Sequence, residues 1–473
     1  RVNPWEYVLL MEGFPLFAAA AAGRDGIMTQ GASAPFSVEF SRAGFDSEGK
    51  GEGTLNETWL PIWNHPSTFA EIGRIFAEGR ACVGRRPART GTDFARAVST
   101  LGVDRGIASF ERYVCLQRRG LSHIAYPAGT MDVRLRPKVS RLSDTDEITS
   151  SLDGFVRKLK STPAALEEIM SRIEHATFRC AQFPEPRHFG DLIRAYGCLE
   201  KYVALQNSPE KKPDRPFGGT LSPEWIGLCD GGTPEIRLAA SLASITSSEN
   251  VGTIRTTLSG VDADNPRSWG KNAPLRRNGA SFPDLLAGLL SRRLLDADRL
   301  GVPGIPLKAD LAARIEDVML FLRGETDDDR IEEYLWGFLW IRRPGTKKHG
   351  EEDDSVFGSL SKKWNNQPAG RPFSRLYGLF KLLHHPTGPD STVFKREPRI
   401  LPLLAAGRTD EALDVAVRRL CISGLKPLPL TIAEAVDPVR LAASLAFPLN
   451  NRTIQKIAKT VLVPQKDDNT RNA

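Results

Sequence analysis

Apolar and polar positions in the first third of the chain follow the periods of both regular structures. Three segments resemble β-strands in their alternation or short apolar runs, and they span residues 35–40, 110–117 and 121–126. Two further segments, residues 67–76 and 93–101, carry apolar side chains at helical spacing. This part of the chain is therefore predicted to be mixed α/β.

The first helix is predicted over residues 3–23, where Asn3 is a good N-cap and Pro4 occupies the first helical position. Two glutamates, a glycine and Pro15 interrupt its apolar run, whereas a membrane span needs about 20 consecutive apolar residues. We therefore expect a buried core helix that is kinked at Pro15.

From about residue 143 onward, apolar residues recur at helical spacing almost throughout. Residues 207–223 carry several lysines and prolines and predict a linker or mobile loop. The heptapeptide RLAASLA occurs twice, at residues 237–243 and 440–446. This identity indicates either an internal repeat of a small helical unit or two Ala/Leu-rich packing faces, which helices favour.

The chain of 473 residues is long enough for two to four domains. We predict an α+β, predominantly helical fold, in which a mixed α/β basic N-terminal part precedes helical domains and a C-terminal helical bundle. The expected domains are residues 1–142, 143–306 and 307–473.

One helix of the last domain is apolar nearly all round. Residues 331–339 form an apolar stripe at helical spacing, while Trp336 and Trp340 project from other faces. Such a helix is either buried or meets a partner protein. We expect Trp336 and Trp340 to form a partner interface.

Positive charge is concentrated in one segment. Residues 73–141 contain thirteen arginines, one lysine and five acids, a local net charge of +9, whereas the whole chain carries +7. Arginine binds phosphate bidentately and tolerates partial burial. The concentration indicates a nucleic-acid contact or, alternatively, a solvated surface whose arginines pair with acids elsewhere in the fold.

The arginines occur where the chain is expected to be exposed. Residues 84–91 predict a loop, bracketed by glycine and broken by proline, and residues 118–120 predict a hairpin tip. A second, smaller basic group follows near residue 271. The candidate nucleic-acid-binding residues are Arg80, Arg85, Arg86, Arg89, Arg96, Arg118, Arg119, Arg134, Arg136, Lys138, Lys271, Arg276 and Arg277.

Catalytic and metal-binding patterns are not recognisable. The sequence contains no GxxxxGK[ST], HExxH or GxSxG motif, and its six cysteines lack zinc spacing, which predicts free thiols in a reducing cytoplasm. His384 and His385 are adjacent in a turn-like context, and we expect a surface or hinge role there. We expect no catalytic residue, metal or cofactor, and a binding or scaffolding role in the cytoplasm.

Long stretches of the sequence resemble a known family. The resemblance is carried by VNPWEYVLLMEGFPLFAAAAAGR (residues 2–24), by the stretch from TWLPIWNHPSTF to GIASFERY (58–113) and by LSPEWIGLCDGGTPEIRLAASLAS (221–244). Residues 266–297 fit more loosely. These stretches are similar to the large subunit of the type I-G (formerly I-U) CRISPR surveillance complex, Cascade. Family members usually carry a further N-terminal region, so the resemblance implies that this chain corresponds to the later part.

The resemblance implies a non-catalytic subunit of an RNA-guided effector, in which base pairing reads sequence and protein contacts read backbone and shape. Such a subunit binds target DNA, helps to open the duplex and stabilises the displaced strand. The implied partners are CRISPR RNA, double-stranded target DNA, the displaced non-target strand, the Cascade backbone subunits, the crRNA-processing subunit and a recruited helicase-nuclease. Two alternatives stay open: a metal-dependent nuclease with unrecognised ligands, and a helical protein–protein adaptor.

Overall fold

The computed structural model confirms the predicted fold class. The fold is α+β and predominantly helical, with 56% of the described residues in helices and 10% in strands. The structure describes residues 3–18, 36–39, 54–78, 81–103, 106–118, 122–246, 251–262, 265–271, 273–275, 281–343, 350–366, 373–389, 393–429 and 436–463.

The chain folds into two compact units. Unit 1 contains Arg1–Ser143 and Pro163–Leu192, and unit 2 contains Asp144–Thr162 and Ile193–Ala473. The chain therefore crosses between the units three times. The three-part division into domains stays a prediction, but this grouping differs from it by placing residues 163–192 with the N-terminal part.

Unit 1 is built on an antiparallel sheet with the strand order β1–β2–β5–β6. The strands are β1 (Ser37–Val38), β2 (Thr54–Ile62), β5 (Ser109–Arg118) and β6 (Ser122–Asp132). The predicted pairing of the two long strands is confirmed, with Phe110 opposite Met131. Strand β2 was not among the predicted strands.

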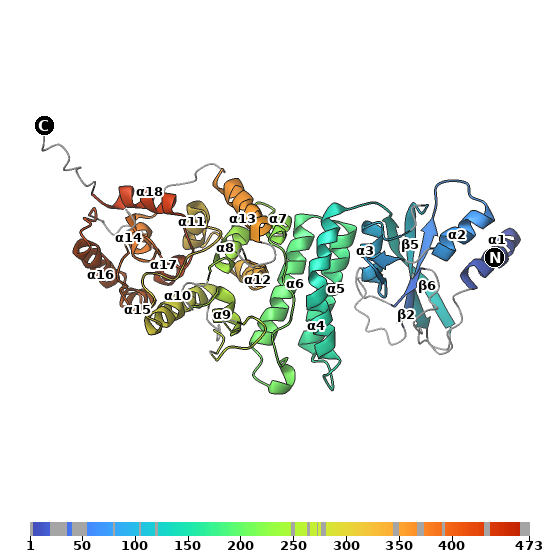
Figure 1. Ribbon diagram of the computed structural model, residues 1–473, viewed down its shortest axis with the longest axis horizontal. Coiled ribbons are helices and arrows are strands. Elements are labelled where there is room, and N and C mark those ends of the chain that lie inside the picture. Colours follow the sequence, from blue (N-terminus) through green and yellow to red (C-terminus); the bar gives the residue numbers. More distant parts are fainter. Residues whose placement is uncertain are drawn as a thin grey trace. The chain divides into compact units, whose positions relative to one another are not determined.

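Four helices and a small hairpin make up most of the rest of unit 1 (Figure 1). The helices are α1 (Pro4–Ala18), α2 (Phe69–Glu78), α3 (Gly91–Ser99) and α5 (Ala164–Gln182), and the hairpin pairs β3 (Cys82–Val83) with β4 (Arg86–Pro87). Helix α3 packs against α5, and the Ser99 hydroxyl donates to the carbonyl of Ala181 at 2.7 Å. The helix α6 (Pro186–Ala204) begins in unit 1 and continues in unit 2.

Aromatic rings and one ion pair form the centre of unit 1. Trp59 of β2 stacks on Phe94 of α3 with ring centroids 4.6 Å apart. Beside them, the buried Arg112 guanidinium donates two hydrogen bonds to Glu57, at 2.7 and 2.9 Å, and lies 4.7 Å from the Phe178 ring centroid. This core joins the sheet to α3 and α5, and α3 holds the surface described below.

Helix α1 contradicts the prediction of a buried core helix. The helix forms as expected from Asn3 and Pro4, but Trp5, Leu9 and Leu10 are exposed by 75%, 70% and 67%. Because the described apolar side chains from Trp5 to Met11 are exposed, the hydrophobic pattern correctly predicted the helix and wrongly predicted the burial of this part.

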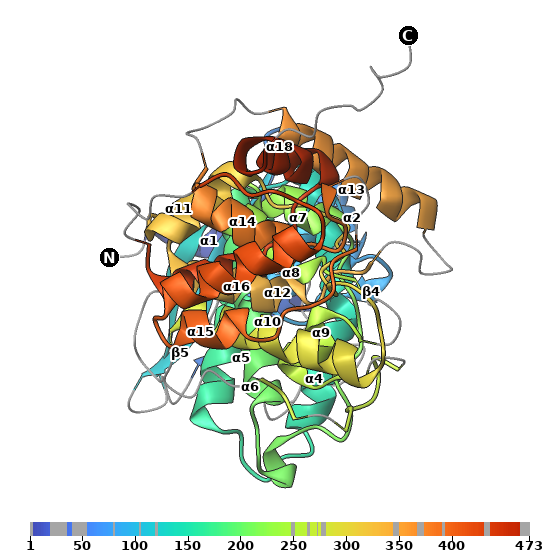
Figure 2. The same ribbon diagram turned by 90° about the vertical axis from the view of Figure 1, so that its left-hand side faces the viewer.

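The named secondary-structure elements described in unit 2 are all helices (Figure 2). Besides the rest of α6 and two 3₁₀ segments (Pro137–Thr145, which starts in unit 1, and Pro209–Lys211), its helices are α4 (Asp146–Val156), α7 (Glu224–Cys229), α8 (Pro234–Ala243), α9 (Ile254–Ser259), α10 (Phe282–Arg299), α11 (Ile315–Arg323), α12 (Asp328–Phe338), α13 (Gly350–Asn365), α14 (Arg375–Leu383), α15 (Ile400–Ala405), α16 (Thr409–Ile422), α17 (Pro438–Ser444) and α18 (Asn451–Val461).

Helices α6 and α12 cross at two glycines. A Cβ added to Gly337 would lie 2.4 Å from the Ile193 carbonyl oxygen, and one added to Gly197 would lie 2.6 Å from the Gly337 nitrogen. An Arg194–Glu333 ion pair at 2.8 Å lies beside this crossing. Only glycine allows backbones to approach this closely, so the two positions fix where the helices meet.

The two RLAASLA segments form α8 and α17, and both helices contact α11. Both begin with proline, and the equivalent arginines pair with aspartates, Arg237 with Asp317 and Arg440 with Asp328. The packing face that the composition predicted is confirmed, because both helices are largely buried. The internal repeat stays a prediction.

The segment 207–223 was predicted to be a linker, and this prediction is wrong. Phe217 is buried with its ring 5.8 Å from that of Phe155, and Leu221 forms a parallel bridge with Ile341. Its prolines and lysines therefore belong to a packed part of unit 2.

Candidate nucleic-acid interface

The exposed loop predicted around residue 85 is a hairpin in unit 1. Gly84 adopts a positive φ of 60°, a conformation that glycine favours, and this turns the chain between β3 and β4. Arg85 lies in the turn and Arg89 follows β4, and both side chains are exposed. The prediction of an exposed arginine loop is confirmed for these two residues.

Asp93 neutralises the third arginine of the loop. It lies in the first turn of α3, where its backbone N–H donates to the Thr90 hydroxyl at 3.2 Å. Its carboxylate accepts a hydrogen bond from the Arg86 guanidinium at 2.8 Å and from the Arg89 backbone N–H at 3.2 Å. The charge of Arg86 is therefore paired locally, by an acid seven residues later in the chain.

A second exposed basic segment follows β6. Arg134 and Lys138 are exposed, whereas Arg136 between them is buried and anchors the segment. The Arg136 guanidinium donates to the Ser99 hydroxyl at 3.1 Å and to the Asp132 carbonyl at 3.2 Å. Burial, with the nearby charge of Arg134, lowers the pKa of Arg136.

Both segments are attached to the C-terminal end of α3. The backbone N–H of Cys82 donates to the Gly102 carbonyl at 2.8 Å, and that of Arg136 donates to the Ser99 carbonyl at 2.8 Å. The fold therefore brings two basic segments about 50 residues apart in sequence to one end of one helix. We call Arg85, Arg89, Arg134 and Lys138 the basic surface. Within the described ranges, these four side chains form no ion pair.

Two predicted nucleic-acid contacts are structural instead. Arg96 is buried in α3 with its guanidinium 3.9 Å from the Asp93 carboxylate, and Arg136 is buried as described above. Neither side chain is available to a ligand, so both assignments are wrong. Arg80, Arg119, Arg276 and Arg277 lie outside the described residues, as does the side chain of Arg118 at the end of β5.

The predicted partner interface at Trp336 and Trp340 is also wrong. Both indoles are buried in unit 2, and that of Trp340 donates to the Tyr196 carbonyl at 3.2 Å. The Arg255 guanidinium lies 4.7 Å from the centroid of the Trp340 ring. The helix that is apolar nearly all round is thus buried in its own unit.

The surface or hinge role expected for His384 and His385 is wrong as well. Both are buried, and their rings donate to the carbonyls of Phe380 at 2.8 Å and Leu449 at 2.9 Å. Burial lowers the pKa of His384 to about 4. His385 thereby holds the end of α14 to the chain that follows α17, whereas His384 bonds within α14.

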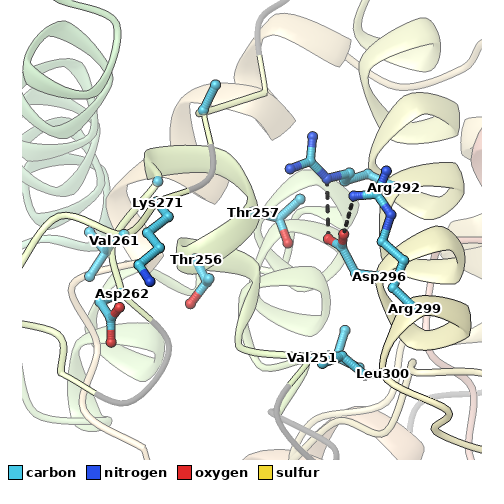
Figure 3. A pocket seen from close by; sticks show the side chains of 13 residues that line it. Val251, Thr256, Thr257, Val261, Asp262, Lys271, Arg292, Asp296, Arg299 and Leu300 are labelled. Atoms are coloured by element: carbon cyan, nitrogen blue, oxygen red, sulfur yellow. Dashed lines mark hydrogen bonds and ion pairs between the residues drawn. The ribbon is translucent and has the colours of Figure 1, made fainter.

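Lys271 does not belong to the basic surface, because it lies in unit 2 at the edge of a cavity (Figure 3). Arg292 and Arg299 of α10 line the same cavity and were not predicted. Their spacing of seven residues within a predicted helix would place them on one face, a signal that the sequence does carry.

The described residues contain no cluster of three or more His, Cys, Asp or Glu side chains suited to hold a metal ion. Among the described helices, none has the length and apolar character to cross a membrane. No protein-family model matches the chain, and no curated protein sequence is significantly similar to it.

Proposed function

We propose that the chain is a non-catalytic, DNA-binding large subunit of an RNA-guided effector of the type I Cascade class. In this role it binds target DNA, helps to open the duplex, stabilises the displaced strand and supports recruitment of the helicase-nuclease. The sequence resemblance suggests this class and its partners, CRISPR RNA and the other Cascade subunits.

The observation that carries the proposal is the basic surface of unit 1. Its four cations come from two separate segments, are exposed, and form no ion pair among the described residues. The Asp93 carboxylate beside the hairpin already accepts hydrogen bonds from the Arg86 guanidinium and the Arg89 backbone. Unpaired cations on one surface are suited to phosphate, and such contacts bind duplexes of any sequence.

The test measures binding of the purified full chain to a short fluorescein-labelled DNA duplex over a range of salt concentrations. The variant Arg85→Ala/Arg89→Ala removes two exposed guanidinium groups and should weaken binding. If each contacts one phosphate, the slope of log affinity against log salt should fall in magnitude by roughly 1.8. Changes on an exposed loop should alter the unfolding free energy by less than about 0.5 kcal/mol.

Arg187→Ala is the matched control. Arg187 is also an exposed arginine of unit 1, but its guanidinium pairs with Glu185 at 2.9 Å. Its loss should leave the affinity and the salt slope nearly unchanged. If the double variant binds duplex DNA with the affinity and slope of the unaltered chain, the basic surface is a solvated or protein-contacting surface and the proposal fails.

A further inference from the structure

A cavity of about 520 Å³ lies within unit 2, between α9, α10 and the chain around residues 260–271. Its volume is within the range that small-molecule sites occupy, about 300–1,000 Å³. Three cationic side chains line it, Lys271, Arg292 and Arg299, together with the carboxylates of Asp262 and Asp296. The lining therefore has an excess of one positive charge.

The first wall is held in place by backbone hydrogen bonds. Val261 and Trp269 form an antiparallel bridge, and the N–H of Gly270 donates to the Gly260 carbonyl at 2.8 Å. The Trp269 indole fixes this turn by donating to the Pro213 carbonyl at 2.9 Å. Lys271 and Asp262 lie together on this wall (Figure 3).

The opposite wall is the C-terminal half of α10. Asp296 lies between two arginines, with Arg292 at 3.2 Å and Arg299 at 3.8 Å (Figure 3). Because two guanidinium groups share one carboxylate, their charge is only partly neutralised and donor groups remain for an anion. The side chain of Arg299 is 72% exposed, so it lies at the mouth.

The interior of the cavity is mostly apolar. Val251 and Val261 are buried, and the nearly buried Thr257 adds a hydroxyl that can donate or accept. Lys271 is exposed and, like Arg299, lies at the rim. Apolar side chains and cationic groups that line one cavity suit a ligand that joins a flat, weakly polar ring to an anionic group.

We propose that this cavity binds one nucleotide of single-stranded DNA, with the base against its apolar lining and its flanking phosphates at Lys271 and Arg299. The Thr257 hydroxyl offers a hydrogen-bonding partner for the polar edge of a base. The choice of a DNA strand as the source of the nucleotide rests on the proposed function. The nucleotide chemistry follows from the cavity itself.

The test measures binding of the full chain to a fluorescein-labelled oligothymidylate and, separately, to free thymidine monophosphate by calorimetry. In Lys271→Ala/Arg299→Ala, two strand phosphates lose their partners. The salt slope for the oligonucleotide should then fall in magnitude by roughly 1.4, at about 0.7 for each phosphate of a single strand. An oligonucleotide that carries 5-iodouracil should crosslink under light to peptides covering residues 251–262 and 292–300.

Lys308→Ala/Arg323→Ala is the matched control, since both residues are exposed cations of unit 2 outside the cavity. An unchanged salt slope in the cavity variant, or crosslinks confined to other peptides, overturns the inference. So does a variant that loses only thymidine monophosphate, because the cavity would then serve a free nucleotide. Oligonucleotide binding by Arg85→Ala/Arg89→Ala separates the two proposals. If this variant binds more weakly and the cavity variant binds normally, the proposed function holds and the cavity inference fails.

Discussion

The Glu57 carboxylate is fully buried and accepts hydrogen bonds from Arg112 and from the Trp59 indole. A carboxylate without water or cation would be strongly destabilising at this position, because desolvation opposes its charge. A Cβ on Gly91 would lie 2.1 Å from Glu57, so the first residue of α3 also has to remain glycine.

Arg112→Met is expected to destabilise the chain by about 3–5 kcal/mol, because it leaves the Glu57 charge buried without its partner. The measurement is urea unfolding followed by the fluorescence of the eight tryptophans, of which Trp59 is one. The double variant Glu57→Gln/Arg112→Met also removes the negative charge of Glu57 and should recover part of the lost unfolding free energy. If the single and double variants are equally stable, the pair does not hold the core as described.

Lys381 gives unit 2 a distinct dependence on pH. Its ammonium group is fully buried and donates to the carbonyls of Leu445 and Phe447, both at 2.7 Å. Burial lowers its pKa from 10.5 to about 7. Between these values the unfolded chain binds more protons than the folded chain, so this residue makes the unfolding free energy rise with pH from about 7 to 10.5.

Lys381→Met should therefore flatten the dependence of the unfolding free energy on pH between 7 and 9.5, measured by denaturant titration at several pH values. His384 and His385 lie nearby, but burial lowers their pKa values, so they titrate below this window. Lys308→Met, at an exposed lysine, is the control. A slope that Lys381→Met leaves unchanged would mean that the ammonium group stays charged in the folded chain throughout the window.

The exposure of a single arginine could be predicted only where the neighbouring residues in the sequence determine it. Glycine and proline around Arg85 and Arg89 exclude a helix and keep the loop outside the core. Arg96 lies three residues after Asp93 on a helix, so its pairing could have been inferred. Arg136 bonds to Ser99, 37 residues earlier, and nothing local indicates such a contact.

At the scale of elements, helices and the central hairpin were predictable and their burial was not. Strand β2 was not predicted because its polar residues, among them Glu57, are typical of a loop. In the structure Glu57 is buried in the core. Helix α1 failed in the opposite sense, since an apolar sequence was found exposed. Hydrophobic periodicity is a property of the local sequence, whereas the burial of a helix or strand depends on which other segments pack against it.

The two RLAASLA helices differ in how deeply their ion pairs lie. The Arg237–Asp317 side chains are 5% and 2% exposed, and the Arg440–Asp328 side chains are 19% and 20% exposed. Arg237→Ala should therefore destabilise unit 2 by about 3–5 kcal/mol, because it leaves the buried Asp317 carboxylate without its partner. Arg440→Ala should cost clearly less, since water can solvate Asp328.

Thermal unfolding of the two variants, followed by circular dichroism, checks this order. The double variants Arg237→Ala/Asp317→Ala and Arg440→Ala/Asp328→Ala serve as controls, because they remove each pair entirely. Equal losses in the two single variants would show that depth of burial does not set the contribution of these pairs.

At the scale of the whole molecule, the concentration of charge was the sequence feature that pointed to the basic surface. The grouping of the chain into units was not predictable, because residues 163–192 form helices like those that follow them but pack with unit 1. Helical periodicity identifies the apolar face of a helix, but it does not identify the element that packs against that face.

The proposed role predicts no cleavage of DNA by this chain alone. Purified protein incubated with magnesium or manganese and labelled duplex or single-stranded DNA should leave the substrate intact on a denaturing gel. The partner helicase-nuclease would perform the cutting. Metal-dependent cleavage that disappears when acidic residues of this chain are replaced would favour the nuclease alternative.

The threefold crossing of the chain between units also orders events on the ribosome. The sheet is complete once residue 132 has emerged, but α5, which contributes Phe178 and Ala181 to its core, follows only after α4 of the other unit. At about 5–20 residues per second, several seconds of synthesis separate these elements. During that interval the face around Trp59 and Arg112 lacks its cover, so nascent chains of this length should need shielding by a chaperone.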